Sequence, residues 1–413
     1  EIESSLNHHE RQHKDLRPGV CDDDNDEINL GKGNADPEAE PSRTGPDSSI
    51  RIPYRKVEEL VKHNCPGRAV KLMESSLENK VATPSEETSR QLRMLFPPNS
   101  EADRLPSLSS LKLSLDSDEG NGVKVRASNE VIFELESLFV VDLVRRLPKQ
   151  SAQGVSGWTF DLVKALLIVP GVADSLTALI VAMLEGRAGN PWIWTRSRLI
   201  PLRKNTSSGD GGIRPIAIGE ALYRIAASVA MAKFSHHGKF VPHQWGIGIQ
   251  GGAEVVAHAS QLFAEVCLEN KTSKPCAIQQ IDFQNAFNCI GRRCILDRLV
   301  EHSPELVPMF LWSYGQPSPL FLSDGSLECH SCTGVRQGDP LGPLFFCIGL
   351  QPLLEKTISE NSSCILLAYM DDISIMGRIM AMITVTEITI KRIIMTGSIK
   401  ETILAIFLST SAS

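Results

Sequence analysis

The spacing of hydrophobic residues changes along the middle of the chain, and this change predicts where helices and strands fall. Helical spacing of apolar residues covers the segments 131–147, 160–168 and 254–268, and a further helix is expected from about Arg292. Short apolar runs bounded by turn residues predict strands at 196–203, 213–218, 276–281, 364–368 and 373–376.

The last two predicted strands flank Met370-Asp371-Asp372, which indicates a tight hairpin turn with two adjacent carboxylates. Successive side chains on extended backbone point in opposite directions, so the two aspartates reach one point only if the turn reorients them. Like charges repel, and hard oxygen ligands suit magnesium or manganese, so the pair makes sense as a cation site. Taken alone, the dipeptide is weak evidence, because most Asp-Asp pairs are ordinary solvated turns.

The charge of the chain is unevenly distributed over its 413 residues, a length that can hold two or three domains. Residues 1–50 carry 13 Asp and Glu against 5 Lys and Arg, a net of −8, so the remaining 363 residues sum to +1 of the total of −7. The acidic first segment has few large apolar residues and is expected to be disordered. Binding of polyanions must therefore depend on local basic clusters in the rest of the chain.

The ten cysteines are scattered without a disulfide framework, which favours a reducing compartment inside the cell, nucleus or cytoplasm. Cys329 and Cys332 form a lone C-x-x-C pair with no second pair at zinc-site distance, so no zinc is expected. No run of about 18 apolar residues occurs, and no membrane span is predicted.

A basic β-hairpin is predicted from the strands at 196–203 and 213–218 and the Ser/Gly/Asp loop between them. Residues 196–224 have a local net charge of +4, from Arg196, Arg198, Arg203, Lys204, Arg214 and Arg224 against Asp210 and Glu220. Such a hairpin is suited to closing over phosphates, while the alternative is a solvated edge hairpin protected by its basic residues.

Two further segments carry candidate polar residues. The strand at 276–281 delivers Asp282 at its carboxyl end. The glycine-framed loop 334–340 is expected to precede a helix that runs to Leu354, with Asp339 as its N-cap and Pro340 in its first turn.

The segment 246–251 matches the dinucleotide fingerprint by letter, but no strand precedes it, and that interpretation is rejected.

The order of these parts resembles the reverse transcriptase family, and within it most closely the enzymes of non-LTR retrotransposons. The resemblance covers about residues 131–377 and includes the blocks at 154–159, 213–220 and 244–254. It implies an α+β polymerase right hand, in which fingers and a palm are present and the antiparallel palm sheet packs on helices.

The resemblance assigns the chemistry to three carboxylates. Asp282 and Asp371 match the residues that bridge two Mg²⁺ ions, for which Mn²⁺ is an alternative, and Asp372 matches a third, less direct ligand. The implied substrates are an RNA template, a DNA primer and deoxynucleoside triphosphates.

Further residues match positions around the nucleotide. Phe287 matches the aromatic residue that excludes a ribose 2′-hydroxyl, although its alternative is an ordinary core position. The other matches are Gln337 and Gly338 for nucleotide and template contact, Arg214 and Lys204 for the triphosphate, and Tyr369, Met370 and Arg336 for places near primer and template.

The expected organisation follows from these matches and from composition. It comprises a disordered segment 1–50, an N-terminal extension and linker 51–128, fingers 129–275, a palm 276–377 and an aberrant tail 378–413. Because the resemblance stops at residue 377, the family's primer grip and thumb are expected to be missing and the chain to polymerise poorly.

Two other functions remain open at this point. One is a non-catalytic retroelement relic that keeps the fold and binds nucleic acid. The other is an intron-maturase type of reverse transcriptase, which the blocks at 154–159 and 244–246 fit less well.

Overall fold

The computed structural model describes residues 81–98, 104–111, 123–125, 131–204, 212–234, 240–269, 276–283, 285–360, 362–379 and 401–408, with side chains for all but 123–125 and 401–408. These residues all belong to the second of the two units into which the chain divides, Glu1–Leu77 and Glu78–Ser413. The expected N-terminal segment 1–50, the tip of the basic hairpin at 205–211 and most of the tail lie outside the described residues.

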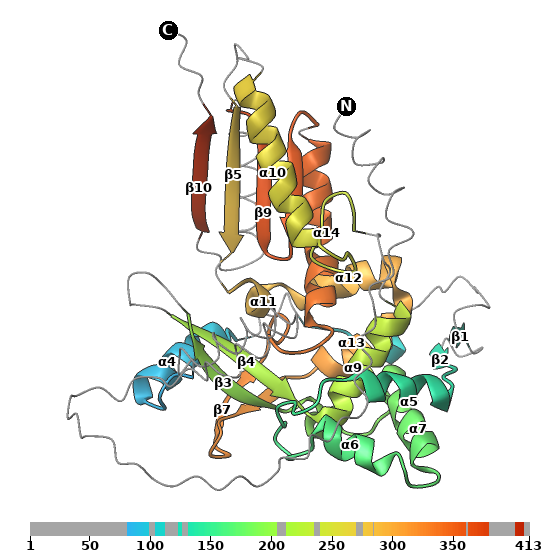
Figure 1. The fold of residues 1–413 in the computed structure, drawn as a ribbon. Helices are drawn as coiled ribbons and strands as arrows, with labels where there is room; N and C mark the ends of the chain where they lie inside the picture. The colour runs from blue at the N-terminus through green and yellow to red at the C-terminus, as the bar shows by residue number, and fades with distance from the viewer. Residues whose placement is uncertain are drawn as a thin grey trace, which may run out of the picture. The chain divides into compact units, whose positions relative to one another are not determined.

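Helices and strands alternate along the described chain (Figure 1). The helices are α4 (Glu86–Leu95), η2 (Leu108–Ser110), α5 (Ser137–Arg146), α6 (Phe160–Leu166), α7 (Val172–Leu184), α8 (Pro191–Thr195), α9 (Ala221–Phe234), α10 (Gly252–Glu269), α11 (Ala286–Cys289), α12 (Arg292–His302), η3 (Pro304–Leu306), α13 (Val307–Tyr314) and α14 (Gly342–Ser359). The strands are β1 (Val123–Val125), β2 (Val131–Phe133), β3 (Ser197–Arg203), β4 (Ile213–Gly219), β5 (Cys276–Phe283), β6 (Ser318–Phe321), β7 (Leu327–Ser331), β8 (Ile365–Tyr369), β9 (Asp372–Arg378) and β10 (Glu401–Leu408). The expected α+β class is confirmed in this general form.

One four-stranded sheet, called the carboxylate sheet below, has the order β10-β5-β9-β8 with every neighbouring pair antiparallel. Its two faces are covered differently. Ile278, Leu367 and Met376 pack beneath α10, and the opposite face joins the main core with α14 (Figure 1). The predicted amphipathic helix at 254–268 is thus confirmed as α10, which contacts all four strands.

The sequence of β5 explains how one strand can serve both faces. Side chains alternate between faces along a strand, so Ala277, Ile281 and Phe283 enter the main core while Ile278 faces α10. Asp282 shares the face of Ile278 but lies at the far end of the strand, where its side chain is exposed. The same alternation in β9 puts Asp372 on this face.

The second four-stranded sheet, called the hairpin sheet, has the order β4-β3-β6-β7. The predicted basic hairpin is confirmed as β3 and β4, which pair antiparallel from Ser197↔Gly219 to Arg203↔Ile213. Helix α4 packs on this sheet, with Leu92 and Phe96 against residues of β3, β4 and β6. Ser85 caps the helix by accepting a hydrogen bond from Thr88 N at 3.1 Å.

Two predicted helices begin in the wrong place, and both errors have tertiary causes. Residues 131–133 form β2, because they pair with β1, and helix α5 begins only at Ser137. Helix α14 begins at Gly342 and runs to Ser359. Asp339 does not cap it, because its carboxylate accepts hydrogen bonds from other residues such as Tyr223. Helices α6, α12 and the β8–β9 hairpin lie close to where they are predicted.

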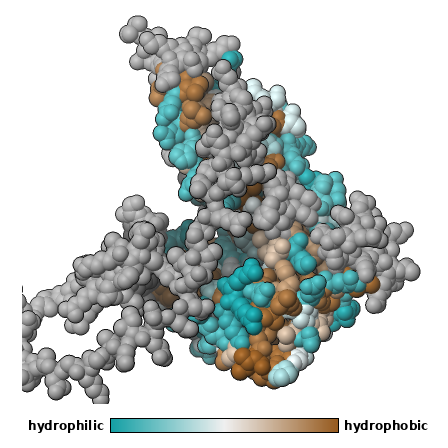
Figure 2. Space-filling model, turned by 45° about the vertical axis from the view of Figure 1, so that its right-hand side comes forward, coloured by the Kyte–Doolittle hydropathy of each residue, from teal (hydrophilic) through white to brown (hydrophobic). Residues whose placement is uncertain are grey.

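The described surface mixes hydrophilic and hydrophobic side chains (Figure 2). Large exposed hydrophobic residues follow one another on α6 and just after it, namely Leu162, Leu166, Ile168 and Val169. Across the part of the chain that the structure describes, no helix has the length and apolar character needed to cross a bilayer.

Candidate active site

The three candidate carboxylates lie at one end of the carboxylate sheet. Asp282 is the seventh residue of β5, and Asp372 begins β9, whose next residue Ile373 pairs with Ile281. Asp371 and Met370 form the two-residue turn between β8 and β9, which closes with the pair Tyr369↔Asp372. Strands far apart in the sequence therefore bring Asp282 beside the Asp371–Asp372 turn.

At this end of the sheet, the negative charge of the carboxylates exceeds the positive charge nearby. Burial raises the pKa of Asp371 above its usual 3.8, and the negative charges of Asp372 and Asp282 raise this pKa further. The pKa of Asp372 is raised by burial and by the charge of Asp282. Neighbouring carboxylates resist joint ionisation unless positive charge compensates them, so the corner favours a bound cation.

Arg214 supplies part of that positive charge from the hairpin sheet. It is exposed on β4 opposite Leu202, and its charge lowers the pKa of both Asp371 and Asp372. Lys204 lies exposed at the end of β3, where its backbone amide donates to Gly212 O at 2.8 Å. Of the two candidate triphosphate residues, Arg214 is thus the one whose charge acts on the carboxylates.

The loop 334–339 connects the hairpin sheet to Phe287. Ala217 N donates to Gln337 O at 2.7 Å, and Val335 N donates to Phe287 O at 2.7 Å. Gly338 adopts φ +107°, and a Cβ added there would meet Ala217 O at 2.6 Å. Only glycine fits this approach, so the loop is fixed on β4 between its two glycines.

Phe287 lies on α11 and is half-buried. Its ring stacks on Phe346 of α14 with centroids 4.6 Å apart and planes within 6°. One face of the Phe287 ring is therefore held by the core, which fixes the position of the side chain.

Arg336 and Asp339 form a buried network that holds this loop from behind. The Arg336 guanidinium donates to Asp339 Oδ2 at 3.0 Å and to Ser318 Oγ at 2.6 Å. Tyr223 and Tyr314 donate to the same Asp339 oxygen at 2.5 and 2.7 Å. Arg336, expected beside primer and template, is only 2 % exposed, and its guanidinium is committed to these partners.

Asp339, Tyr223 and Tyr314 are residues whose role the sequence did not reveal. The expected N-cap role for Asp339 is replaced in part: its Oδ1 accepts from Leu341 N at 2.9 Å, before the helix begins. An arginine between apolar segments needs buried acceptors, and this requirement is the signal that could have indicated a network. Its partners could not be named, because Tyr223 lies 116 residues from Asp339.

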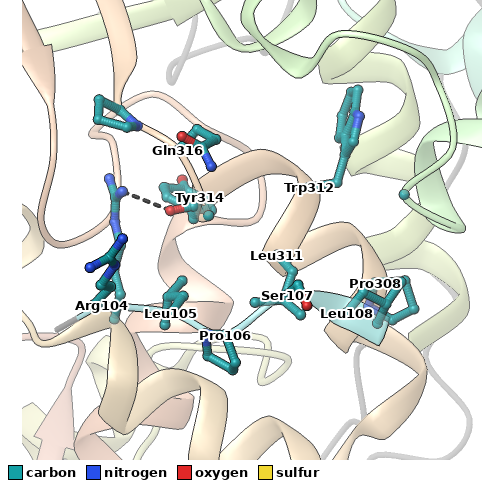
Figure 3. A pocket seen from close by; sticks show the side chains of 14 residues that line it. Arg104, Leu105, Pro106, Ser107, Leu108, Pro308, Leu311, Trp312, Tyr314 and Gln316 are labelled. Atoms are coloured by element: carbon teal, nitrogen blue, oxygen red, sulfur yellow. Dashed lines mark hydrogen bonds between the residues drawn. The ribbon is translucent and has the colours of Figure 1, made fainter. Parts of the chain in front are cut away.

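A cavity of about 500 Å³ lies apart from the candidate residues (Figure 3). It is lined by the segment around Arg104 and by α13, including Trp312 and Tyr314. None of the candidate site residues lines it, and it reaches the buried network only through Tyr314. The strand pairing and the charge effects instead bring the candidate residues together at the carboxylates.

The described residues contain no group of three or more His, Cys, Asp or Glu side chains arranged to hold a metal ion. Two carboxylates are nevertheless what a magnesium site of this kind needs from the protein. Mg²⁺ keeps several waters and is usually bound through one or two carboxylates together with substrate phosphates. The pair of Asp282 and Asp371 fits that pattern, with Asp372 as the residue that follows Asp371.

Comparison with known proteins relates this part of the chain to reverse transcriptases. Residues 202–392 match the family model described as reverse transcriptase (RNA-dependent DNA polymerase). The chain is also similar to the retrotransposable element SLACS 132 kDa protein of Trypanosoma brucei gambiense, at 29 % identity over 250 residues, which are 56 % of this chain and 19 % of that protein. The chain thus spans about a fifth of the length of the curated relative it matches. The matched region contains every candidate site residue. Residues 202–392 thus correspond to a reverse transcriptase (RNA-dependent DNA polymerase) domain, in a chain that is similar to a retrotransposon protein.

Proposed function

We propose that this chain catalyses RNA-directed DNA synthesis at the end of the carboxylate sheet, by nucleotidyl transfer onto the 3′-hydroxyl of a DNA primer. The observation that carries the proposal is the convergence of four charged residues, seen in the strand pairing and in the effects of Asp282 and Arg214 on the pKa of Asp371 and Asp372. The substrates are an RNA template, a DNA primer and deoxynucleoside triphosphates. The branch is that of the non-LTR retrotransposons.

Asp282 and Asp371 hold two Mg²⁺ ions in this proposal, and Asp372 supports them from the start of β9. When bound, the ions lower the pKa of the primer hydroxyl and stabilise the charge on the leaving pyrophosphate. The carboxylates contribute by fixing the position of that positive charge. The raised pKa values of Asp371 and Asp372 in the metal-free chain describe a site that is complete only with a cation.

Arg214 and the loop 334–339 receive the nucleotide. The Arg214 guanidinium binds triphosphate oxygens, because it is exposed, permanently charged and within electrostatic range of the carboxylates. Lys204 adds charge from the adjacent strand. Gln337 and Gly338 face nucleotide and template, and their backbone is fixed by Ala217.

Phe287 selects deoxynucleotides by packing where a 2′-hydroxyl would stand. The stack on Phe346 supports this role, since a wall that moved would reject nothing. Tyr369 and Met370 lie next to the primer end, on the strand and turn that carry Asp371.

The proposed architecture assigns fingers to residues 129–275 and a palm to residues 276–377. The hairpin sheet strands β3 and β4 are then part of the fingers, and the carboxylate sheet is the centre of the palm. This assignment is supported by the family match, which begins in β3 and continues through β9.

The test is extension of an annealed DNA primer on an RNA template by the full chain. Incorporation should require Mg²⁺ or Mn²⁺ and should be lost in Asp371→Ala. Asp297→Ala is the matched control, because Asp297 is an exposed aspartate on α12 whose partner is Arg293. Absence of extension by the parent chain under all conditions would favour the non-catalytic relic, and equal activity in Asp371→Ala would refute the assignment of the site.

A further inference from the structure

The catalytic turn is held by a residue that the proposed mechanism does not use. Gln244 lies in the Gln244-Trp245-Gly246 block, between α9 and α10, and its side chain is completely buried. Its amide Nε2 donates to Met370 O at 3.0 Å, and its Oε1 accepts from Met370 N at 2.7 Å. One side chain thus satisfies both backbone polar groups of the residue before Asp371.

The backbone of this turn needs an external constraint. Met370 has φ +57°, a left-handed conformation that non-glycine residues rarely adopt, while Asp371 does not share it. Positive φ at only the first central position is the pattern of a type II′ turn, which favours glycine there. A methionine persists in this conformation because its surroundings determine it, and such residues are concentrated at functional sites.

The segment around Gln244 also holds the strand that leads into the turn. Ala368 N donates to His243 O at 2.6 Å, and Trp245 N donates to Ala368 O at 2.7 Å. These bonds form a parallel bridge between Gln244 and Ala368 on the free edge of β8. Strand and turn are therefore fixed by the same short segment.

Gly246 packs directly against Met370, which requires a residue without a side chain. Its backbone N donates to Gln244 Oε1 at 3.0 Å, which orients the Gln244 amide toward Met370. A Cβ at this position would meet Met370 N at 2.5 Å and Met370 Cγ at 2.6 Å. Any larger residue at position 246 would therefore displace the turn.

We infer that Gln244 is a positioning residue for catalysis, which sets the Met370 backbone and thereby the direction in which Asp371 and Asp372 present their carboxylates. Gly246 provides the space that this contact requires. The inference rests on the proposed function of the two aspartates, and it gives the Gln244-Trp245-Gly246 block a physical task. Outer groups that orient ligands in this way typically contribute 10- to 100-fold to metal affinity or activity.

The first measurement is hydrogen–deuterium exchange over residues 365–376 in the full chain. Gln244→Leu keeps the volume of the side chain and removes its hydrogen bonds, so exchange at Met370 should become about fivefold faster or more. Gln261→Leu is the matched control, because Gln261 lies exposed on α10 and bonds only Glu265. Unchanged exchange at the turn in Gln244→Leu would overturn the inference.

The second measurement is the affinity for Mn²⁺, followed by electron paramagnetic resonance of the full chain without nucleotide. Gln244→Leu and Gly246→Ala should each weaken Mn²⁺ binding by about 10- to 100-fold, while Gln261→Leu should leave it unchanged. In primer extension, kcat should fall by a similar factor with the KM for nucleotide unchanged within about twofold, since Arg214 and Gln337 are untouched.

The outcomes separate this inference from the proposed function. Faster exchange with unchanged Mn²⁺ affinity and unchanged kcat would overturn the positioning role and leave only a structural contact. A fall in activity that matches the loss of folded protein, measured by thermal unfolding, would overturn it as well. Absence of both Mn²⁺ binding and extension in the parent chain would refute the proposed function, and exchange would still decide whether Gln244 fixes the turn.

Discussion

Two groups of aspartates in this protein lie near arginines, and they differ in how fully their negative charge is compensated. Asp339 is 5 % exposed, and one of its oxygens accepts from Arg336, Tyr223 and Tyr314 at once. At the other centre, burial and the charge of Asp282 raise the pKa of both Asp371 and Asp372, and Arg214 offsets this only in part.

The difference shows that a compensated aspartate can stabilise the fold, whereas an uncompensated aspartate is available to a ligand. Side chains of the protein already donate hydrogen bonds to the Asp339 oxygen that faces Arg336. Asp339 can therefore fix the loop 334–339, but it has few free acceptor sites for a ligand. The centre at Asp371 is left short of positive charge, which weakens the metal-free fold slightly and creates affinity for a cation. The following predictions test this contrast, from the largest expected effect to the smallest.

The largest effect is expected from Asp339→Asn. It removes the carboxylate and leaves Arg336 as a buried cation without its counter-charge, so the free energy of unfolding should fall by about 3–5 kcal/mol. Urea denaturation of the full chain measures it. Asp297→Asn breaks an exposed pair with Arg293, 2.8 Å apart, and should cost about 1 kcal/mol or less.

Equal losses of stability in Asp339→Asn and Asp297→Asn would contradict the contrast between the buried and the exposed pair. A double variant, Arg336→Met with Asp339→Leu, sharpens the test further. Removing both charges should cost less than Asp339→Asn alone, because no unpaired buried ion remains.

A moderate effect is expected from Tyr314→Phe and from Tyr223→Phe. Each change removes one hydroxyl that donates to Asp339, and a hydrogen bond to a charged group contributes about 1.5–3 kcal/mol. Thermal unfolding and urea denaturation provide the values. Losses below about 0.5 kcal/mol in both variants would show that Arg336 alone compensates Asp339.

A small gain in stability is expected from Asp371→Asn in the metal-free chain. The raised pKa of Asp371 means that its ionised form is disfavoured by folding, so the neutral amide should raise the free energy of unfolding by less than about 1 kcal/mol at pH 7. Mg²⁺ with a triphosphate should reverse the order, because ligand binding then stabilises only the parent. A destabilised variant in EDTA would contradict the contrast.

The smallest effect is the pH dependence of stability in EDTA. Folded pKa values above 3.8 for Asp371 and Asp372 contribute stability below the unfolded pKa, and this contribution is lost as pH rises through the raised values. Thermal unfolding of the parent, relative to Asp371→Asn with Asp372→Asn, should therefore show a difference that grows from pH 4 upward. A difference that does not change with pH would refute the raised pKa values.

Local patterns predicted the elements whose partners are close in sequence. The β8–β9 hairpin, the β3–β4 hairpin and α10 follow from alternation or helical spacing that one segment contains by itself. Residues 131–133 break this rule. They continue a helical pattern in the sequence but pair with β1, and no local signal reports that pairing.

The candidate site was predictable where motif order places it and unpredictable where distant contacts make it. Asp282 and Asp371 could be singled out as strand-end and turn carboxylates. Gln244 could not be connected to Met370, 126 residues away, because a buried amide in the segment between two helices has no local signature. Arg336 looked like a nucleic-acid contact for the same reason: its acceptors come from α9, α13 and β6.

The bond from Ala217 N to Gln337 O fixes the middle of β4 to the loop 334–339. Arg214 lies three residues from this bond, at about 10 Å along the strand given a rise of roughly 3.3 Å per residue. Beyond the bond the hairpin is also held by α4, against which Ile213 packs, and by the bridge between Val81 and Leu202. The position of Arg214 is therefore tied through the loop 334–339 to Val335 and the Phe287 carbonyl.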